Sequence, residues 1–134
     1  MMAHLPAILG LTLCEDVVAD PQTRNISLIR SFTGLSVDSS RSLAPPFCVF
    51  AALTDGIGEA AIELGVSLLA DVFEEIYRVQ SRLQFSDRLQ VVYYLMRLSR
   101  CPLPTEGSYL FNLRIDGQWM AQRSLRVQGP EQTP

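Results

Sequence analysis

The segment E-G-S-Y-L-F-N-L-R-I-D-G-Q-W, residues 106–119, alternates apolar and polar side chains and then reaches Asp-Gly. Alternation with a period of two is typical of a β-strand with one buried face, here formed by alternate residues from Tyr109 to Ile115. Asp116 and Gly117 tolerate the positive φ angles of a two-residue turn, so they predict a tight β-hairpin. The chain must therefore contain a sheet with a buried face.

The return strand of this hairpin needs an irregularity. A two-residue turn sets Leu113 opposite Met120 on the inner face, yet Leu125 has the opposite parity from Met120. A bulge between Ala121 and Ser124 would restore the parity, and a longer turn would do the same. The bulge is the favoured interpretation.

Strand patterns bounded by turn residues recur along the rest of the chain. Apolar or alternating runs of strand length cover residues 7–18, 26–34, 47–53, 59–68, 89–98, 108–115 and 119–127. The segment 69–83 is ambiguous, because its apolar residues fit helical spacing while residues 77–85 alternate as in a strand. Strand is favoured there. About eight strands predict an all-β fold, a single antiparallel β-sandwich.

Composition sets the domain organisation and excludes some partners. A chain of 134 residues with 48 % apolar and 19 % charged residues suits one domain over 1–128, followed by a flexible tail at 129–134. The net charge is −3, and the basic residues, all arginines, form no cluster, which argues against nucleic acid. No apolar run approaches the roughly 18 residues that span a membrane.

The three cysteines, Cys14, Cys48 and Cys101, are widely spaced and form no C-x-x-C motif. Their spacing and odd number argue against a zinc site and against a disulfide framework. Buried thiols in a cytoplasmic protein are the favoured interpretation, and one disulfide pair remains open.

Catalytic and metal-binding signals are weak. His4 is the one histidine, and no nucleophile, P-loop or dinucleotide motif occurs, so we expect neither an enzyme nor a cofactor. Asp55 and Glu59 in D-G-I-G-E are weak candidate metal ligands, with Asp87 and Asp116 from other loops. A turn with solvated acids is the favoured interpretation.

Two further sets of residues are candidate interaction surfaces. Arg78 and Arg82 share one face of a predicted strand, and Arg97 and Arg100 are candidates for the strand beside it. Such a basic stripe could bind phosphate or an acidic partner, but it is more typical of a solvated sheet face. Residues 89–98 are apolar on both faces, although one face of an antiparallel sheet normally meets water. We therefore expect Val91, Tyr93 and Leu95 to be covered by a loop, by a helix from 69–83 or by another subunit.

Several motifs resemble known families. E-G-S-Y-L-F-N-L resembles the immunoglobulin-like strand whose tyrosine closes a loop with its hydroxyl, which places Tyr109 in a tyrosine corner; Phe111 stands where antibody domains have cysteine. The early L-x-L-C-E-D, the central P-P-F-x-V-F-A-A-L-T-D-G-x-G-E and the terminal G-x-Y-x-F-x-L-x-x-D-G hairpin resemble, together, a family of small bacterial β-sandwich proteins. That family has no established activity, so the resemblance implies a fold and carries no site residues.

These observations favour a cytoplasmic, non-enzymatic interaction or structural module that forms a homodimer through the sheet containing 89–98. If the partner is a different protein, its identity is unknown. The alternative is a β-sandwich that binds a ligand or an ion with loops at one end.

Overall fold

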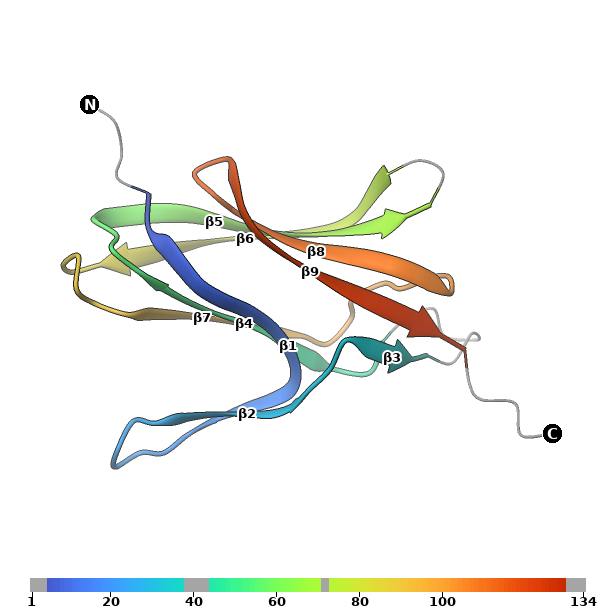
Figure 1. The fold of residues 1–134 in the computed structure, drawn as a ribbon, viewed down its shortest axis with the longest axis horizontal. Helices are drawn as coiled ribbons and strands as arrows, with labels where there is room; N and C mark the ends of the chain where they lie inside the picture. Colours follow the sequence, from blue (N-terminus) through green and yellow to red (C-terminus); the bar gives the residue numbers. More distant parts are fainter. Residues whose placement is uncertain (1–4, 38–43, 71–72, 130–134) are drawn as a thin grey trace.

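The structure, a computed structural model, describes residues 5–37, 44–70 and 73–129. In these ranges the chain forms nine β-strands in two layered sheets (Figure 1). The four-stranded sheet has the order β2-β1-β4-β7, made of β2 (Ile26–Ser31), β1 (Ala7–Ala19), β4 (Phe47–Thr54) and β7 (Val92–Leu98). The five-stranded sheet has the order β3-β9-β8-β5-β6, made of β3 (Gly34–Ser36), β9 (Gln118–Gln128), β8 (Gly107–Ile115), β5 (Gly58–Leu69) and β6 (Phe73–Phe85).

This architecture confirms the all-β, two-sheet prediction and corrects two details. The segment that could have been a helix is the strand β6, paired antiparallel with β5. The prediction of an antiparallel sandwich of about eight strands needs one correction, because Gly34–Ser36 forms the short strand β3, which pairs parallel with β9. The finer, immunoglobulin-like assignment stays a prediction at this point.

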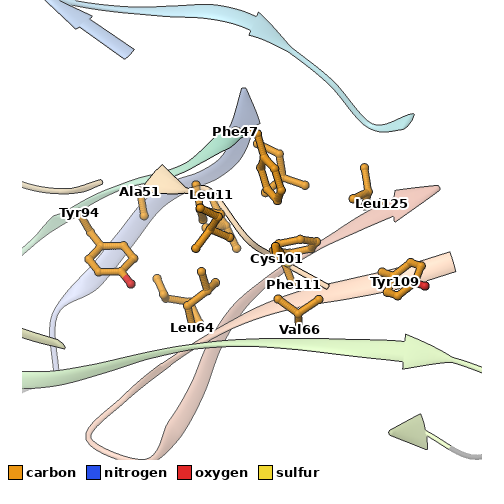
Figure 2. Close-up of a cluster of buried hydrophobic side chains, with 14 of the residues drawn as sticks. Leu11, Phe47, Ala51, Leu64, Val66, Tyr94, Cys101, Tyr109, Phe111 and Leu125 are labelled. Atoms are coloured by element: carbon orange, nitrogen blue, oxygen red, sulfur yellow. The ribbon is translucent and has the colours of Figure 1, made fainter. Parts of the chain in front are cut away.

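The core lies between the two sheets and follows the alternation of the sequence. Inward side chains of β4, such as Phe47 and Ala51, face Leu64 and Val66 of β5 and Phe111 of β8 (Figure 2). All of these are at most 2 % exposed. An edge-to-face contact joins the layers, since the rings of Phe47 and Phe111 lie 5.8 Å apart with an interplanar angle of 74°. The aromatic pair stabilises the packing beyond its buried area.

The β8–β9 hairpin has the predicted turn and a displaced bulge. Asp116 and Gly117 have φ angles of 49° and 82°, as a two-residue turn of this hand requires. Arg114 pairs with Trp119, but Leu113 pairs with Ala121, so Met120 is the extra residue. The bulge therefore lies nearer the turn than expected, and it restores the parity of the strand.

Tyr109 closes the loop that leads into β8. Its side chain is completely buried, while its hydroxyl donates a hydrogen bond to Thr105 O at 2.6 Å and accepts one from Thr105 N at 3.1 Å. The geometry is that of the tyrosine corner expected from the sequence.

Replacing Tyr109 by phenylalanine should lower the free energy of unfolding by about 1 kcal/mol, the usual net value of a buried hydrogen bond. Phenylalanine keeps the buried ring, so the loss reports the hydroxyl alone. Urea denaturation followed by tryptophan fluorescence measures it. Equal midpoints for the two proteins would contradict a structural role for the hydroxyl.

The predicted domain, 1–128, and the predicted tail, 129–134, stay predictions. β9 ends at Gln128, and Gly129 N donates to Glu106 Oε1 at 2.7 Å. Most of the predicted tail, 130–134, lies outside the described residues, as does His4. No helix among the residues described is long and apolar enough to cross a membrane.

Candidate functional site

The outer face of the four-stranded sheet, turned away from the core, carries rows of side chains from three neighbouring strands. The register of β1, β4 and β7 sets three residues side by side in each row. The rows are Gly10, Ala52 and Tyr93; then Thr12, Phe50 and Leu95; then Cys14, Cys48 and Arg97. Two rows are thus largely apolar, and the third combines two thiols with a guanidinium.

The apolar side chains of the first two rows have exposed apolar neighbours at the bulge of β1 and just before β7. Together these residues are here called the outer patch, defined as Leu9, Phe50, Val91, Tyr93 and Leu95. Leu9 is 62 % exposed at the bulge of β1, Tyr93 is 50 % exposed and Leu95 is 38 % exposed. The rings of Phe50 and Tyr93 lie 5.4 Å apart. Contiguous apolar surface of this kind is typical of an interaction site.

The outer patch lies at an open edge. β7 pairs only with β4, and its alternate residues Tyr94 and Leu98 point into the core. The three predicted interface residues are therefore exposed, with Val91 (43 %) just before the strand. The predicted helical cover is absent, because that segment forms β6 in the opposite sheet. β7 contains no proline and one charged residue, Arg97, and among the described residues no strand pairs with its second edge.

The third row is held together by Arg97. Its Nη1 donates to Asp16 Oδ1 at 2.6 Å and to Cys48 Sγ at 3.4 Å, and its Nη2 donates to Val17 O at 3.2 Å. The hydrogen bond from Arg97 lowers the pKa of the Asp16 carboxyl below its usual value. Burial raises the pKa of the Cys14 thiol, and the neighbouring Cys48 and Asp16 act in the same direction. The guanidinium thus covers two thiols that are nearly inaccessible.

A pocket of about 600 Å³ opens beside this row. Its walls are mainly apolar, and Glu15, Asp16 and Arg97 supply the charged part. The apolar lining comes from Ile29, Phe32, Leu35, Pro45, Pro46 and Phe47. Sequence reasoning missed this pocket because its walls come from segments that are far apart in the chain and carry no shared motif.

The acidic side chains predicted as weak metal ligands have separate local partners. Asp55 Oδ1 accepts from Arg88 Nε at 2.7 Å, Glu59 pairs with Arg82, and Asp116 Oδ1 accepts from Ala61 N at 2.9 Å. Asp87 Oδ1 accepts from Leu89 N at 2.8 Å. Within the described ranges, no group of three or more His, Cys, Asp or Glu side chains could hold a metal ion.

The outer face of the five-stranded sheet is polar. Arg78 pairs with Glu75 at 2.5 Å and with Glu63 at 3.7 Å. Arg82 pairs with Glu59, so the two arginines that share a face of β6 are both compensated by nearby carboxylates. Arg97 lies on the other sheet, so the structure does not assemble a basic stripe.

These features define a class: a small two-sheet β-sandwich protein with one polar outer face and one exposed apolar outer face. The chain belongs to a family of unknown function, DUF6941, whose model matches residues 9–128. This confirms the resemblance to a family with no established activity. No functionally curated protein matches the chain. The crystal structure of a Bordetella pertussis protein provisionally described as ApaA is similar over 95 % of this chain and 97 % of that chain, with 15 % identity and a TM-score of 0.45.

Proposed function

We propose that this protein is a non-enzymatic interaction module that forms a two-fold homodimer through the outer patch. The observation that carries the proposal is the exposure of Tyr93 and Leu95 on an edge strand. Each Å² of apolar surface left in water costs roughly 25 cal/mol, so covering these side chains favours association. A closed two-fold pair covers both copies at once without forming open fibres.

The shape of the outer face supports a second copy as the occupant. Gly10 and Ala52 are small and stand beside the exposed ring of Tyr93 in the same row. A Cβ added at Gly10 would meet no atom within 4 Å, so this part of the face is open. In a two-fold arrangement, the Tyr93 ring of each copy can pack over the small residues Gly10 and Ala52 of the other copy.

We further propose that the fold is immunoglobulin-like, and the strand order supports this assignment. In immunoglobulin domains one sheet contains strands A, B and E, and the other contains G, F and C, each in that spatial order. The neighbouring strands β1, β4 and β7 would correspond to the first set, and β9, β8 and β5 to the second. Tyr109 then lies at the start of strand F, where the corner tyrosine of these domains is found.

Light scattering on the purified protein tests the homodimer. At tens of micromolar we expect a mass near twice the 14.9 kDa of the chain. Tyr93→Glu should return the mass to that of one chain, because two-fold symmetry would bury two carboxylates in the interface. Trp119→Glu is the matched control, since Trp119 is 39 % exposed on the opposite sheet, and it should leave the dimer intact. A single-chain mass for the unsubstituted protein would refute the homodimer.

The pocket beside Arg97 supports a second candidate function, the binding of a small apolar molecule. Its volume of about 600 Å³ lies within the range of ligand sites. A ligand bound there would raise the melting temperature in a thermal-shift screen of apolar acids and neutral compounds. Leu35→Trp, which fills the pocket, should remove that rise, whereas Tyr93→Glu should not. No shift with any compound would remove this candidate and leave the homodimer untouched.

A further inference from the structure

Cys14 and Cys48 are direct partners in the ladder between β1 and β4. Side chains of directly opposite residues in antiparallel strands point to the same face of the sheet. The two thiols therefore lie side by side on the outer face, 0 % and 2 % exposed. Together with Val17 they form an apolar cluster separate from the main core.

The backbone geometry of such a pair suits a covalent bond. Opposite residues in an antiparallel ladder have Cα atoms about 4.5 Å apart in non-hydrogen-bonded pairs and about 5.5 Å apart in hydrogen-bonded pairs. Disulfides are found with Cα separations of about 4.4–6.8 Å, so either kind of pair falls within the range. The register alone therefore places the two cysteines at a backbone separation that a disulfide can bridge.

The third cysteine takes no part. Cys101 is buried in the main core between the sheets, away from the outer-face cluster, and burial raises the pKa of its thiol to about 12. The fold thus separates one isolated cysteine from one facing pair.

We propose that Cys14 and Cys48 form a reversible redox site. Low-molecular-weight disulfides of the glutathione type oxidise the two thiols to a cross-strand disulfide between them. In a reducing compartment the pair remains as two thiols, as in this structure. The proposal does not rest on the homodimer, because both cysteines belong to one chain and the bond forms within it.

The reaction proceeds by two thiol–disulfide exchanges. The Cys48 sulfur, deprotonated, attacks one sulfur of oxidised glutathione, which forms a mixed disulfide and releases one glutathione thiolate. The deprotonated Cys14 sulfur then attacks the Cys48 sulfur of that mixed disulfide and releases the second glutathione thiolate. The two protons from the cysteines pass to the two released thiolates, so the protein loses two electrons and the oxidant gains them.

Arg97 explains why Cys48 reacts first. Its guanidinium donates to Cys48 Sγ and so places positive charge beside the sulfur that carries negative charge in the first step. The Arg97 side chain is 59 % exposed, so it can move aside to admit the oxidant. Its ion pair with Asp16 at 2.6 Å is a surface contact, which opposes this movement only weakly.

Counting thiols tests the proposal. The folded protein is incubated with oxidised glutathione, quenched in acid, alkylated in denaturant and weighed by mass spectrometry. We expect one alkylated cysteine, Cys101, instead of three, and peptide mapping should link Cys14 to Cys48. Dithiothreitol should restore all three. The matched variant Cys14→Ser cannot close the bond, so it should retain glutathione on Cys48.

Buried thiols can react slowly in the folded protein for want of access. As a control, the unfolded chain is therefore refolded from urea in a glutathione redox buffer. All three cysteines are then accessible before the sheet forms, and we expect the same single linkage. Three alkylated cysteines after refolding, a stable glutathione adduct on Cys48 with Cys14 free, or a bond that involves Cys101 would each overturn the proposal.

Discussion

Replacing Phe111 by alanine should lower the free energy of unfolding by about 3–5 kcal/mol, the range for removal of a buried aromatic side chain. Phe111 is completely buried and its ring meets Phe47 of the opposite sheet edge to face. Phe47 in turn meets Phe32 at 5.7 Å, so one substitution interrupts a row of three rings that connects the two layers. Urea denaturation of the two proteins measures the difference.

Leu110→Ala is the matched control for this prediction. Leu110 is the neighbouring residue of β8, but it points to the outer face and is only partly buried. Its replacement should lower the free energy of unfolding by clearly less than that of Phe111, because less apolar surface is lost and no enclosed cavity remains. Equal losses for the two variants would mean that β8 does not alternate between core and outer face.

The parts of the fold that local sequence determines could be predicted. The alternation from Tyr109 to Ile115 set the inward face of β8, and Asp116 and Gly117 set its turn. In β6 the alternation of apolar and polar residues predicted the observed strand, whereas the helical spacing of its apolar residues did not. These features depend on neighbours along the chain, so a pattern of a few residues carries the information.

The parts that depend on distant segments could not be predicted. β3 has three residues, and its parallel pairing with β9 depends on where the far end of the chain lies. The pocket and the facing Cys14 and Cys48 arise in the same way, since the register between β1 and β4 is not visible in either segment alone. Val91, Tyr93 and Leu95 are exposed in the described chain, and their role as an interface stays a prediction.

The D-G-I-G-E segment shows how a candidate ligand loop can have a packing role. Asp55 and Gly58 adopt positive φ angles of 61° and 72° in the turn between β4 and β5. Gly56 does not need such an angle. A Cβ built at Gly56 would lie 2.6–2.7 Å from three atoms of the Phe85 ring, which is 2 % exposed. This glycine therefore leaves room for a buried ring at the end of the sandwich.

Gly56→Ala should accordingly lower the free energy of unfolding by about 1–3 kcal/mol, the usual effect of overpacking a core. The nearest atoms, Cγ and the two Cδ atoms, belong to the inner part of the Phe85 ring, so a small rotation of the side chain cannot relieve the contact. Chemical denaturation measures the loss. A stability equal to or above that of the unsubstituted protein would show that the ring has room to move.

A control and a double-mutant cycle separate this contact from the general effect of replacing glycine. Gly34→Ala should change stability by less than about 1 kcal/mol, because the added Cβ meets only Arg126 O at 3.7 Å, an ordinary contact. In a Phe85→Ala background the ring is gone, so adding Gly56→Ala should have little further effect. If Gly56→Ala destabilised the protein equally with and without the ring, its effect would come from the backbone of the turn. The turn itself, rather than the packing beneath it, would then explain why glycine stands at this position.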